Sequence, residues 1–134
     1  MTNSFKDIKA WQYAHQFVLD VYKAVRQFPA EERFALSSQF LRAAVSIPAN
    51  IAEGYKRLSK QEKLRFMNIS QGSLEECRYY ILLSKDLDYF TTETHNSLNE
   101  KIEKVSWFLN AYCKGIKNNS GVEDKCPLTP ANSR

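Results

Sequence analysis

Apolar residues recur at alternating steps of four and three along the last regular stretch of this chain. They are Leu98, Ile102, Val105, Leu109, Tyr112 and Ile116. This spacing puts an apolar side chain on the same side of each helical turn and is typical of the seam between antiparallel helices. We therefore expect a helix over about residues 92–116, with Thr91 or Thr92 as its N-cap.

The first regular segment also has helical periodicity. Ser4 and Asp7 have capping-box spacing, a helix is predicted over residues 5–27, and Phe28-Pro29 ends it. Its apolar positions cover nearly half of the circumference, more than one neighbouring helix needs. They are Ile8, Trp11, Ala14, His15, Phe17, Val18, Val21, Tyr22, Val25 and Phe28.

Two further helices are predicted between these segments. One spans about residues 36–57, and Pro48 near its middle removes a backbone hydrogen bond and is expected to kink it. The other spans about 60–87 and opens with a capping box formed by Ser59 and Glu62. Small residues surround the proline and predict close packing against a neighbour. They are Ala43, Ala44, Ser46, Ala49, Ala52 and Gly54.

Together these segments predict an all-α fold, an antiparallel up-down-up-down four-helix bundle with a Pro-kinked second helix. The chain has 134 residues, with four glycines and four prolines, which is little punctuation for a β fold. Residues 1–116 are expected to form the bundle. Residues 117–134 lack periodicity, and we expect a disordered or loosely packed C-terminal tail.

Composition favours a cytoplasmic protein. The N-terminal residues are charged where a signal peptide would be apolar, and no apolar run reaches the ~20 residues of a membrane helix. The three cysteines are far apart in sequence, so neither a disulfide framework nor a zinc site is predicted. A membrane partner is not expected.

Catalytic motifs are missing from the sequence. It contains no GxSxG, P-loop or dinucleotide fingerprint. Di-metal bundles need Glu-x-x-His pairs, whereas His15 follows Gln12 and His95 follows Glu93 by two residues. Cys77 falls among core positions, and His15 falls in an apolar arc where a buried, hydrogen-bonded imidazole is expected. We predict no enzyme, no metal and no cofactor.

Net positive charge is concentrated between the second and third helices. The chain carries 19 basic and 15 acidic residues, and its formal net charge is +4. Residues 56–65 hold the whole excess, because five bases there face the single acid Glu62. These bases are Lys56, Arg57, Lys60, Lys63 and Arg65.

This basic segment has two interpretations. Cations beside a helix N-terminus form a phosphate-binding surface, with Arg42 as a further member on the polar stripe of the second helix. Alternatively, Glu53 pairs with Arg57 at i,i+4, Arg65 bridges helices, and the lysines only keep a loop soluble.

Surplus apolar surface predicts self-association. Trp107 falls almost opposite the seam of the fourth helix, among charged residues, and the first helix has a wider apolar arc than one neighbour can cover. We expect Trp107, Phe17 and Tyr13 at an interface between copies of the chain. The alternative is a surface tryptophan that lies over lysine stems.

Three stretches carry a resemblance to a known family. They are Phe5-Lys6-Asp7-Ile8-Lys9-Ala10-Trp11, the distinctive Arg-Ala-Ala-Val-Ser-Ile-Pro-Ala-Asn-Ile-Ala-Glu-Gly of residues 42–54, and Gly72-Ser73-Leu74-Glu75-Glu76. Over about residues 5–116 the chain resembles the 23S rRNA-intervening-sequence protein family. The resemblance implies a four-helix bundle that assembles as a homopentamer with a central channel and has no associated enzymatic activity.

The resemblance also implies partners. Some members are encoded within insertions in 23S rRNA genes, and a related branch is the accessory protein of diversity-generating retroelements, which binds reverse transcriptase and nucleic acid. This chain departs from the family pattern at Leu41 and Gln71, where members often have arginine, while Arg42, Arg57 and Arg65 match basic positions. The leading hypothesis is a non-catalytic homo-oligomeric scaffold that binds RNA or a ribonucleoprotein partner through the basic segment. DNA and a reverse-transcriptase-like protein are the other candidate partners. The alternative is a protein-only assembly module.

Overall fold

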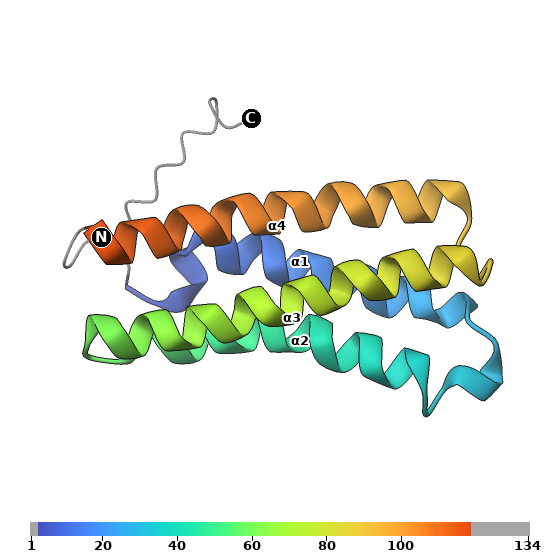
Figure 1. Ribbon diagram of the computed structural model, residues 1–134, viewed down its shortest axis with the longest axis horizontal. Helices are drawn as coiled ribbons and strands as arrows, with labels where there is room; N and C mark the ends of the chain where they lie inside the picture. The colour runs from blue at the N-terminus through green and yellow to red at the C-terminus, as the bar shows by residue number, and fades with distance from the viewer. Residues whose placement is uncertain (1–2, 119–134) are drawn as a thin grey trace.

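The computed structural model describes residues 3–118, which form helices and their connections with no strand among them (Figure 1). The four long helices are α1 (Lys9–Ala24), α2 (Leu36–Tyr55), α3 (Lys60–Asp86) and α4 (Thr92–Asn118). Short 3-10 turns occupy the ends of α1 and its connection to α2, namely η1 (Phe5–Asp7), η2 (Val25–Gln27) and η3 (Ala30–Glu32). The all-α four-helix bundle predicted from the sequence is confirmed.

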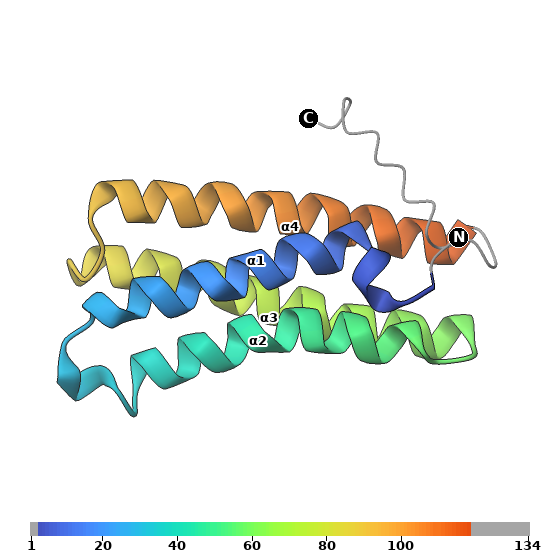
Figure 2. The same ribbon diagram turned by 180° about the vertical axis from the view of Figure 1, so that it is seen from behind.

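Consecutive helices run in opposite directions. The colour gradient passes from left to right along α1 and α3 and from right to left along α2 and α4 (Figure 1), and the view from behind shows the same order (Figure 2). Each helix packs against its two neighbours around the bundle, and α2 and α3 make the most extensive contact. The connection between α2 and α3 therefore lies at the same end of the bundle as the start of α1 and the end of α4.

The start of the first helix differs from the prediction. Ile8 is extended (φ −80°, ψ 122°) and separates η1 from α1, so the predicted helix over 5–27 is divided. The Ser4 hydroxyl accepts a hydrogen bond from the Lys6 N–H at 2.9 Å, and the Asp7 carboxylate accepts one from the Asn3 N–H at 3.0 Å. These polar side chains thus cap the 3-10 turn, while Ile8 is buried in the core.

Other helix ends agree closely with the sequence. The Ser59 hydroxyl accepts a hydrogen bond from the Glu62 N–H at 3.1 Å, and the Thr91 hydroxyl accepts one from the Thr94 N–H at 3.1 Å. α2 ends at Tyr55, two residues before the expected end, and α4 continues to Asn118, two residues beyond it. The rest of the predicted tail lies outside the described residues.

The core contains the predicted seam of α4, but other positions predicted to be buried are exposed. Leu98, Ile102 and Leu109 are almost inaccessible, together with Phe17, Phe40 and Met67 from the other helices. His15 is exposed and its ring stacks on Trp11 at 5.0 Å, so the predicted buried imidazole is wrong. Tyr22, at the edge of the apolar arc predicted for the first helix, is also exposed.

Pro48 lies inside the continuous helix α2 and is buried. Its ring removes one hydrogen-bond donor from the helix without ending it. The kink expected at this position stays a prediction.

Candidate nucleic-acid interface

The distinctive stretch of α2 lies against α3 with little space between the two helices. A β-carbon added to Gly54 would lie 2.5 Å from Met67 Cε and 2.9 Å from Phe66 Cβ. Such distances are shorter than ordinary van der Waals contact, so only glycine fits here without movement of α3. Of the small residues around Pro48, Ala43, Ala44 and Gly54 are buried and are accounted for by packing, whereas Ala49 is exposed.

Hydroxyl groups connect the same two helices. The buried Ser70 hydroxyl donates to the Ile47 carbonyl at 2.8 Å, and the Ser46 and Ser73 oxygens lie 2.8 Å apart. The Asn50 amide donates to the Ser46 carbonyl at 2.9 Å. Polar side chains in this crossing thus have partners, and it offers little unsatisfied chemistry to a ligand.

The basic segment begins where this crossing ends, and its two arginines are held in place. Arg57 pairs with Glu53 at 2.5 Å, as the i,i+4 spacing predicted, and Arg65 pairs with Glu62 at 3.3 Å within α3 rather than across helices. Both guanidinium carbons lie 4.8 Å from the centroid of the Phe66 ring. The structure therefore brings Arg57 and Arg65 together around one aromatic side chain.

Two lysines of the segment bind backbone carbonyls at helix ends. Lys60 Nζ donates to the Lys117 carbonyl at 3.0 Å and so links the start of α3 to the end of α4. Lys63 Nζ donates to the Tyr55 carbonyl at 2.7 Å and lies 5.5 Å from the Tyr55 ring. A cation at a helix C-terminus stabilises the exposed carbonyls there, so both lysines contribute to the fold.

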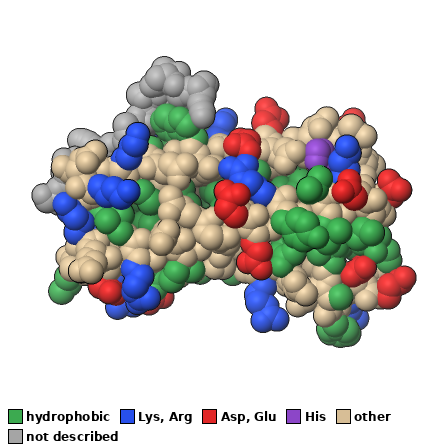
Figure 3. Space-filling model, in the orientation of Figure 1, with side chains coloured by type: hydrophobic (Ala, Val, Ile, Leu, Met, Phe, Trp, Pro, Cys, Tyr) green, Lys and Arg blue, Asp and Glu red, His purple; other side chains and the backbone are tan. Residues whose placement is uncertain are grey.

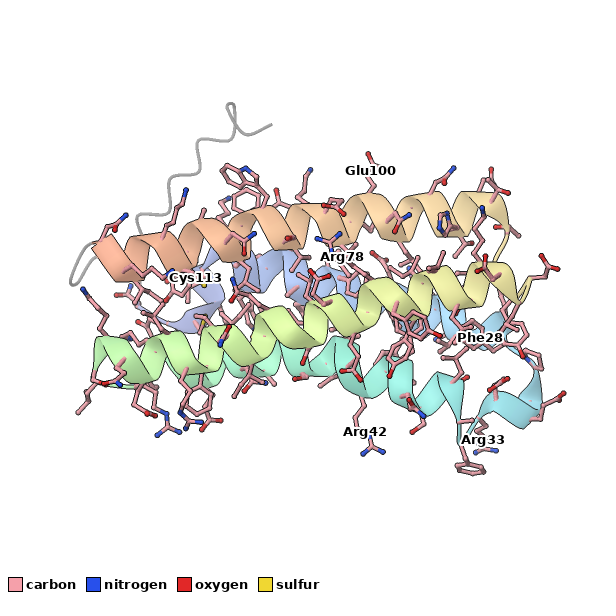
Figure 4. All side chains as sticks on the ribbon, in the orientation of Figure 1. Phe28, Arg33, Arg42, Arg78, Glu100 and Cys113 are labelled. Carbon is pink, nitrogen blue, oxygen red and sulfur yellow. The ribbon has the colours of Figure 1, made fainter. Side chains whose placement is uncertain are left out.

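Lys56 and Arg42 have a different setting. Both are exposed, and neither forms an ion pair with a carboxylate of residues 3–118. Lys56 is the C-cap residue of α2. Arg42 lies nearer the middle of α2 and points away from the bundle (Figure 4), so it is separated from the rest of the predicted site.

Cations from other parts of the chain lie at the same end of the bundle as the basic segment, which the linear sequence does not show. We call this region, made of residues 3–12, 51–66 and 110–118, the basic end. Its three acids are Asp7, Glu53 and Glu62. Its nine bases are Lys6, Lys9, Lys56, Arg57, Lys60, Lys63, Arg65, Lys114 and Lys117.

The opposite end of the bundle is acidic. Residues 20–34 and 84–97 contain four bases and six acids. On the face in Figure 3, blue side chains gather on the left, over the basic end, and red ones dominate the right half. The neutral balance outside residues 56–65 therefore conceals a charge gradient along the bundle, which a linear count cannot show.

The three predicted interface residues have different environments. Tyr13 and Trp107 are half-buried, and both contact Phe108, with ring centroids 4.8 Å and 4.9 Å away. Lys104 Nζ lies 5.4 Å from the Tyr13 centroid. Phe17 is fully buried inside the protomer, so its prediction as an interface residue is wrong. The apolar arc of α1 includes it because α1 packs against both α2 and α4.

Apolar side chains that are more exposed than Tyr13 and Trp107 lie elsewhere on the surface, and the sequence did not predict them as interface residues. Tyr79 and Leu82 on α3 are 55% and 51% exposed, and Leu58 in the α2–α3 connection is 99% exposed. Figure 3 shows a broad apolar area on its right half.

Ionisable groups in the interior are held neutral. Burial raises the pKa of the Cys113 thiol to about 11, and burial together with the negative Glu76 raises the pKa of the Cys77 thiol further. Burial and a hydrogen bond to Glu76 raise the pKa of Tyr80 to about 12. Neither thiol is therefore a thiolate at neutral pH.

The described part of the chain offers neither a metal-binding cluster nor a membrane-spanning helix. Between residues 3 and 118, no three His, Cys, Asp or Glu side chains are grouped to hold a metal ion. None of the helices described for these residues is long and apolar enough to cross a membrane.

Comparisons with known proteins give a similar fold and a matching family. A solved structure from Bacteroides thetaiotaomicron, described as a protein with unknown function from the S23 ribosomal protein family, is similar with a TM-score of 0.72. The two are 24% identical, and the match covers 78% of this chain and 98% of the other. No curated protein matches. The 23S rRNA-intervening sequence protein family matches residues 6–111, and the chain belongs to this family.

Proposed function

We propose that this protein is a non-catalytic homo-oligomeric scaffold that binds RNA through the phosphate groups of its ligand. The observation that carries the proposal is the charge of the basic end, where nine bases accompany three acids. Four of the lysines there, Lys56, Lys60, Lys114 and Lys117, are exposed and form no ion pair with a described carboxylate. Self-association would multiply this charge around a ring and strengthen its field. The family description, 23S rRNA-intervening sequence protein, supports RNA as the polyanion.

The binding test is a titration of salt. If each protomer neutralises about four phosphates, log affinity for single-stranded RNA falls against log salt with a slope of about −3, at ~0.7 per contact. The double variant K56E/K60E should bind far more weakly. The matched control K23E/K85E makes the same change of charge at the opposite end and should bind as the unaltered protein does. Salt-independent binding, or no binding at about 50 mM salt, would contradict the proposal.

The oligomer is tested separately by light scattering. We expect a pentamer, as the family resemblance implies, and the substitution W107E should dissociate it if the surface around Tyr13 and Trp107 joins the copies. A monomer at high protein concentration would remove the scaffold from the proposal and leave RNA binding to be judged alone.

A second candidate is a protein-only assembly module. It is supported by the structural use of four cations. Arg57 and Arg65 bind Glu53 and Glu62, and Lys60 and Lys63 bind the Lys117 and Tyr55 carbonyls. This candidate predicts that K56E/K60E keeps its binding partner and its oligomeric state. The salt titration separates the two candidates.

A further inference from the structure

We propose that the surface formed by Arg57, Arg65 and Phe66 binds single-stranded RNA, with unpaired bases stacked on the guanidinium groups of the two arginines. This inference rests on the proposed function and deepens it by naming the form of the RNA and the surface that receives it. It adds to phosphate contacts a second interaction that depends on shape rather than on charge.

The stacking surface is built from three side chains. The guanidinium groups of Arg57 and Arg65 both lie 4.8 Å from the Phe66 centroid, and Glu53 and Glu62 fix them there by ion pairs. The two arginine side chains are nevertheless 41% and 59% exposed. Two planar cations are therefore held against an aromatic ring and still present a large surface to solvent.

Such a surface suits unpaired nucleotides. Bases that are free of a duplex stack on aromatic rings and on arginine guanidinium planes, and this contributes to affinity with little dependence on sequence. In a duplex the bases are already stacked on one another and are not available. A lysine at the same place would keep the charge but has no planar group to stack.

A separate pocket of about 420 Å³ lies between α2 and α3 nearer the middle of the bundle and is lined by residues that include Arg42, Ser46, Ser73, Glu76 and Tyr80. Its hydroxyl groups already have partners, because the Tyr80 hydroxyl donates to Glu76 at 2.9 Å and the Ser46 and Ser73 oxygens lie 2.8 Å apart. The proposed stacking surface therefore does not extend into this pocket.

Arg42 is an exposed cation farther along α2. It lies thirteen residues before Tyr55, the last residue of α2, which corresponds to about 20 Å at 1.5 Å per residue. At ~3.4 Å per stacked nucleotide, this length accommodates about six nucleotides. The exposed Arg42 side chain forms no ion pair with a described carboxylate and is available to a phosphate at that distance.

The test compares an unstructured twelve-nucleotide RNA with its duplex by fluorescence anisotropy at fixed salt. The double variant R57K/R65K preserves both charges, and we expect its affinity for the single strand to fall about tenfold or more with an unchanged salt slope. F66L, which keeps an apolar side chain, should weaken binding in the same direction. The matched control is R33K, because Arg33 lies over Phe34 at 5.3 Å at the opposite end of the bundle and should not matter.

The outcomes separate the two proposals. The stacking proposal is wrong if R57K/R65K binds the single strand as tightly as the unaltered protein, or if the unaltered protein binds the duplex equally well. Either result would leave the proposal of salt-dependent RNA binding intact. If the unaltered protein binds neither RNA at low salt, the proposed function itself fails. Circular dichroism checks the fold, and R65K alone repeats the test if the double variant does not fold.

Discussion

The crossing of α2 and α3 and the basic end are adjacent on the same two helices, yet they are built in opposite ways. At the crossing, Gly54 and Ser70 allow close contact, and the buried hydroxyl of Ser70 has a backbone partner. At the basic end, cations are exposed or only partly covered, and their partners lie on the surface. The most distinctive stretch of the sequence therefore encodes packing, and the segment that follows it carries the charge.

This difference separates evidence for the family from evidence for a function. The stretch around Pro48 carries part of the resemblance to the family, and its buried residues Ala43, Ala44 and Gly54 leave little room for larger side chains. It does not indicate a ligand, since the polar groups described there are paired with each other. The basic end is therefore the better candidate for a functional surface, because packing constrains substitution less there.

The largest effect on stability is expected from a cavity at the crossing. Ile47 is fully buried, and I47A should lower the free energy of unfolding by about 2–5 kcal/mol. V45A, two residues earlier on the 40% exposed Val45, should change it by about 0.5 kcal/mol or less. Urea unfolding followed by circular dichroism measures both. Equal effects of the two substitutions would break the contrast between core and surface on α2.

The second-largest effect on stability is expected when a methyl group is added at the same crossing. G54A should destabilise the protein by about 1–3 kcal/mol, because the new methyl group meets Met67 and Phe66. G72A is the matched control: its β-carbon meets nothing within 4 Å, so alanine should stabilise the helix by about 0.5–1 kcal/mol. Opposite signs in thermal unfolding support the close approach of α2 and α3. A stabilising G54A would show that the helices separate at no cost.

A smaller loss is expected from the hydroxyl bridge. S70A removes the hydrogen bond to the Ile47 carbonyl and should cost about 0.5–1.5 kcal/mol. S97A, on a half-buried serine of α4 at the opposite end, is the comparison variant and should have less effect. The two denaturation midpoints are compared directly. An S70A protein as stable as the original would mean that this bond contributes nothing net.

The smallest effect on stability belongs to the basic end. E62Q breaks the exposed Glu62–Arg65 pair and should change the free energy of unfolding by about 0.5 kcal/mol or less. Its effect on RNA binding should be larger, because Arg65 would no longer be held against Phe66. Unfolding and anisotropy on the same preparation test this. A large loss of stability in E62Q would contradict this comparison, because it would show that the basic end contributes to folding stability as the crossing does.

Much of the fold was predictable because it depends on local pattern. The seam of α4 and the caps at Ser59 and Thr91 involve residues only three or four positions apart, so a linear sequence shows them. The division of the first helix at Ile8 was not predictable from periodicity. An extended residue there still buries its side chain, and the apolar pattern is the same in both conformations.

The candidate site was predictable only in part. The Glu53–Arg57 pair follows from i,i+4 spacing, but the bond from Lys60 to the Lys117 carbonyl joins residues 57 positions apart and exists only once the bundle closes. The contribution of Lys114 and Lys117 to the basic end has the same origin. A helical projection of the sequence also does not show which side of a helix packs against a neighbour, and this explains the errors at His15 and Tyr22.

The antiparallel course of α1 to α4 has a consequence for how this protein can be joined to another. The first and last described residues both lie at the basic end, as Figure 1 shows. A domain joined by a short flexible linker directly before residue 3 or directly after residue 118 would be delivered to the surface that we propose for RNA, at an effective concentration in the millimolar range. The α1–α2 connection is at the far end and is the better place for a label. Tethering therefore offers a way to recruit or to block the basic end without changing a residue in it.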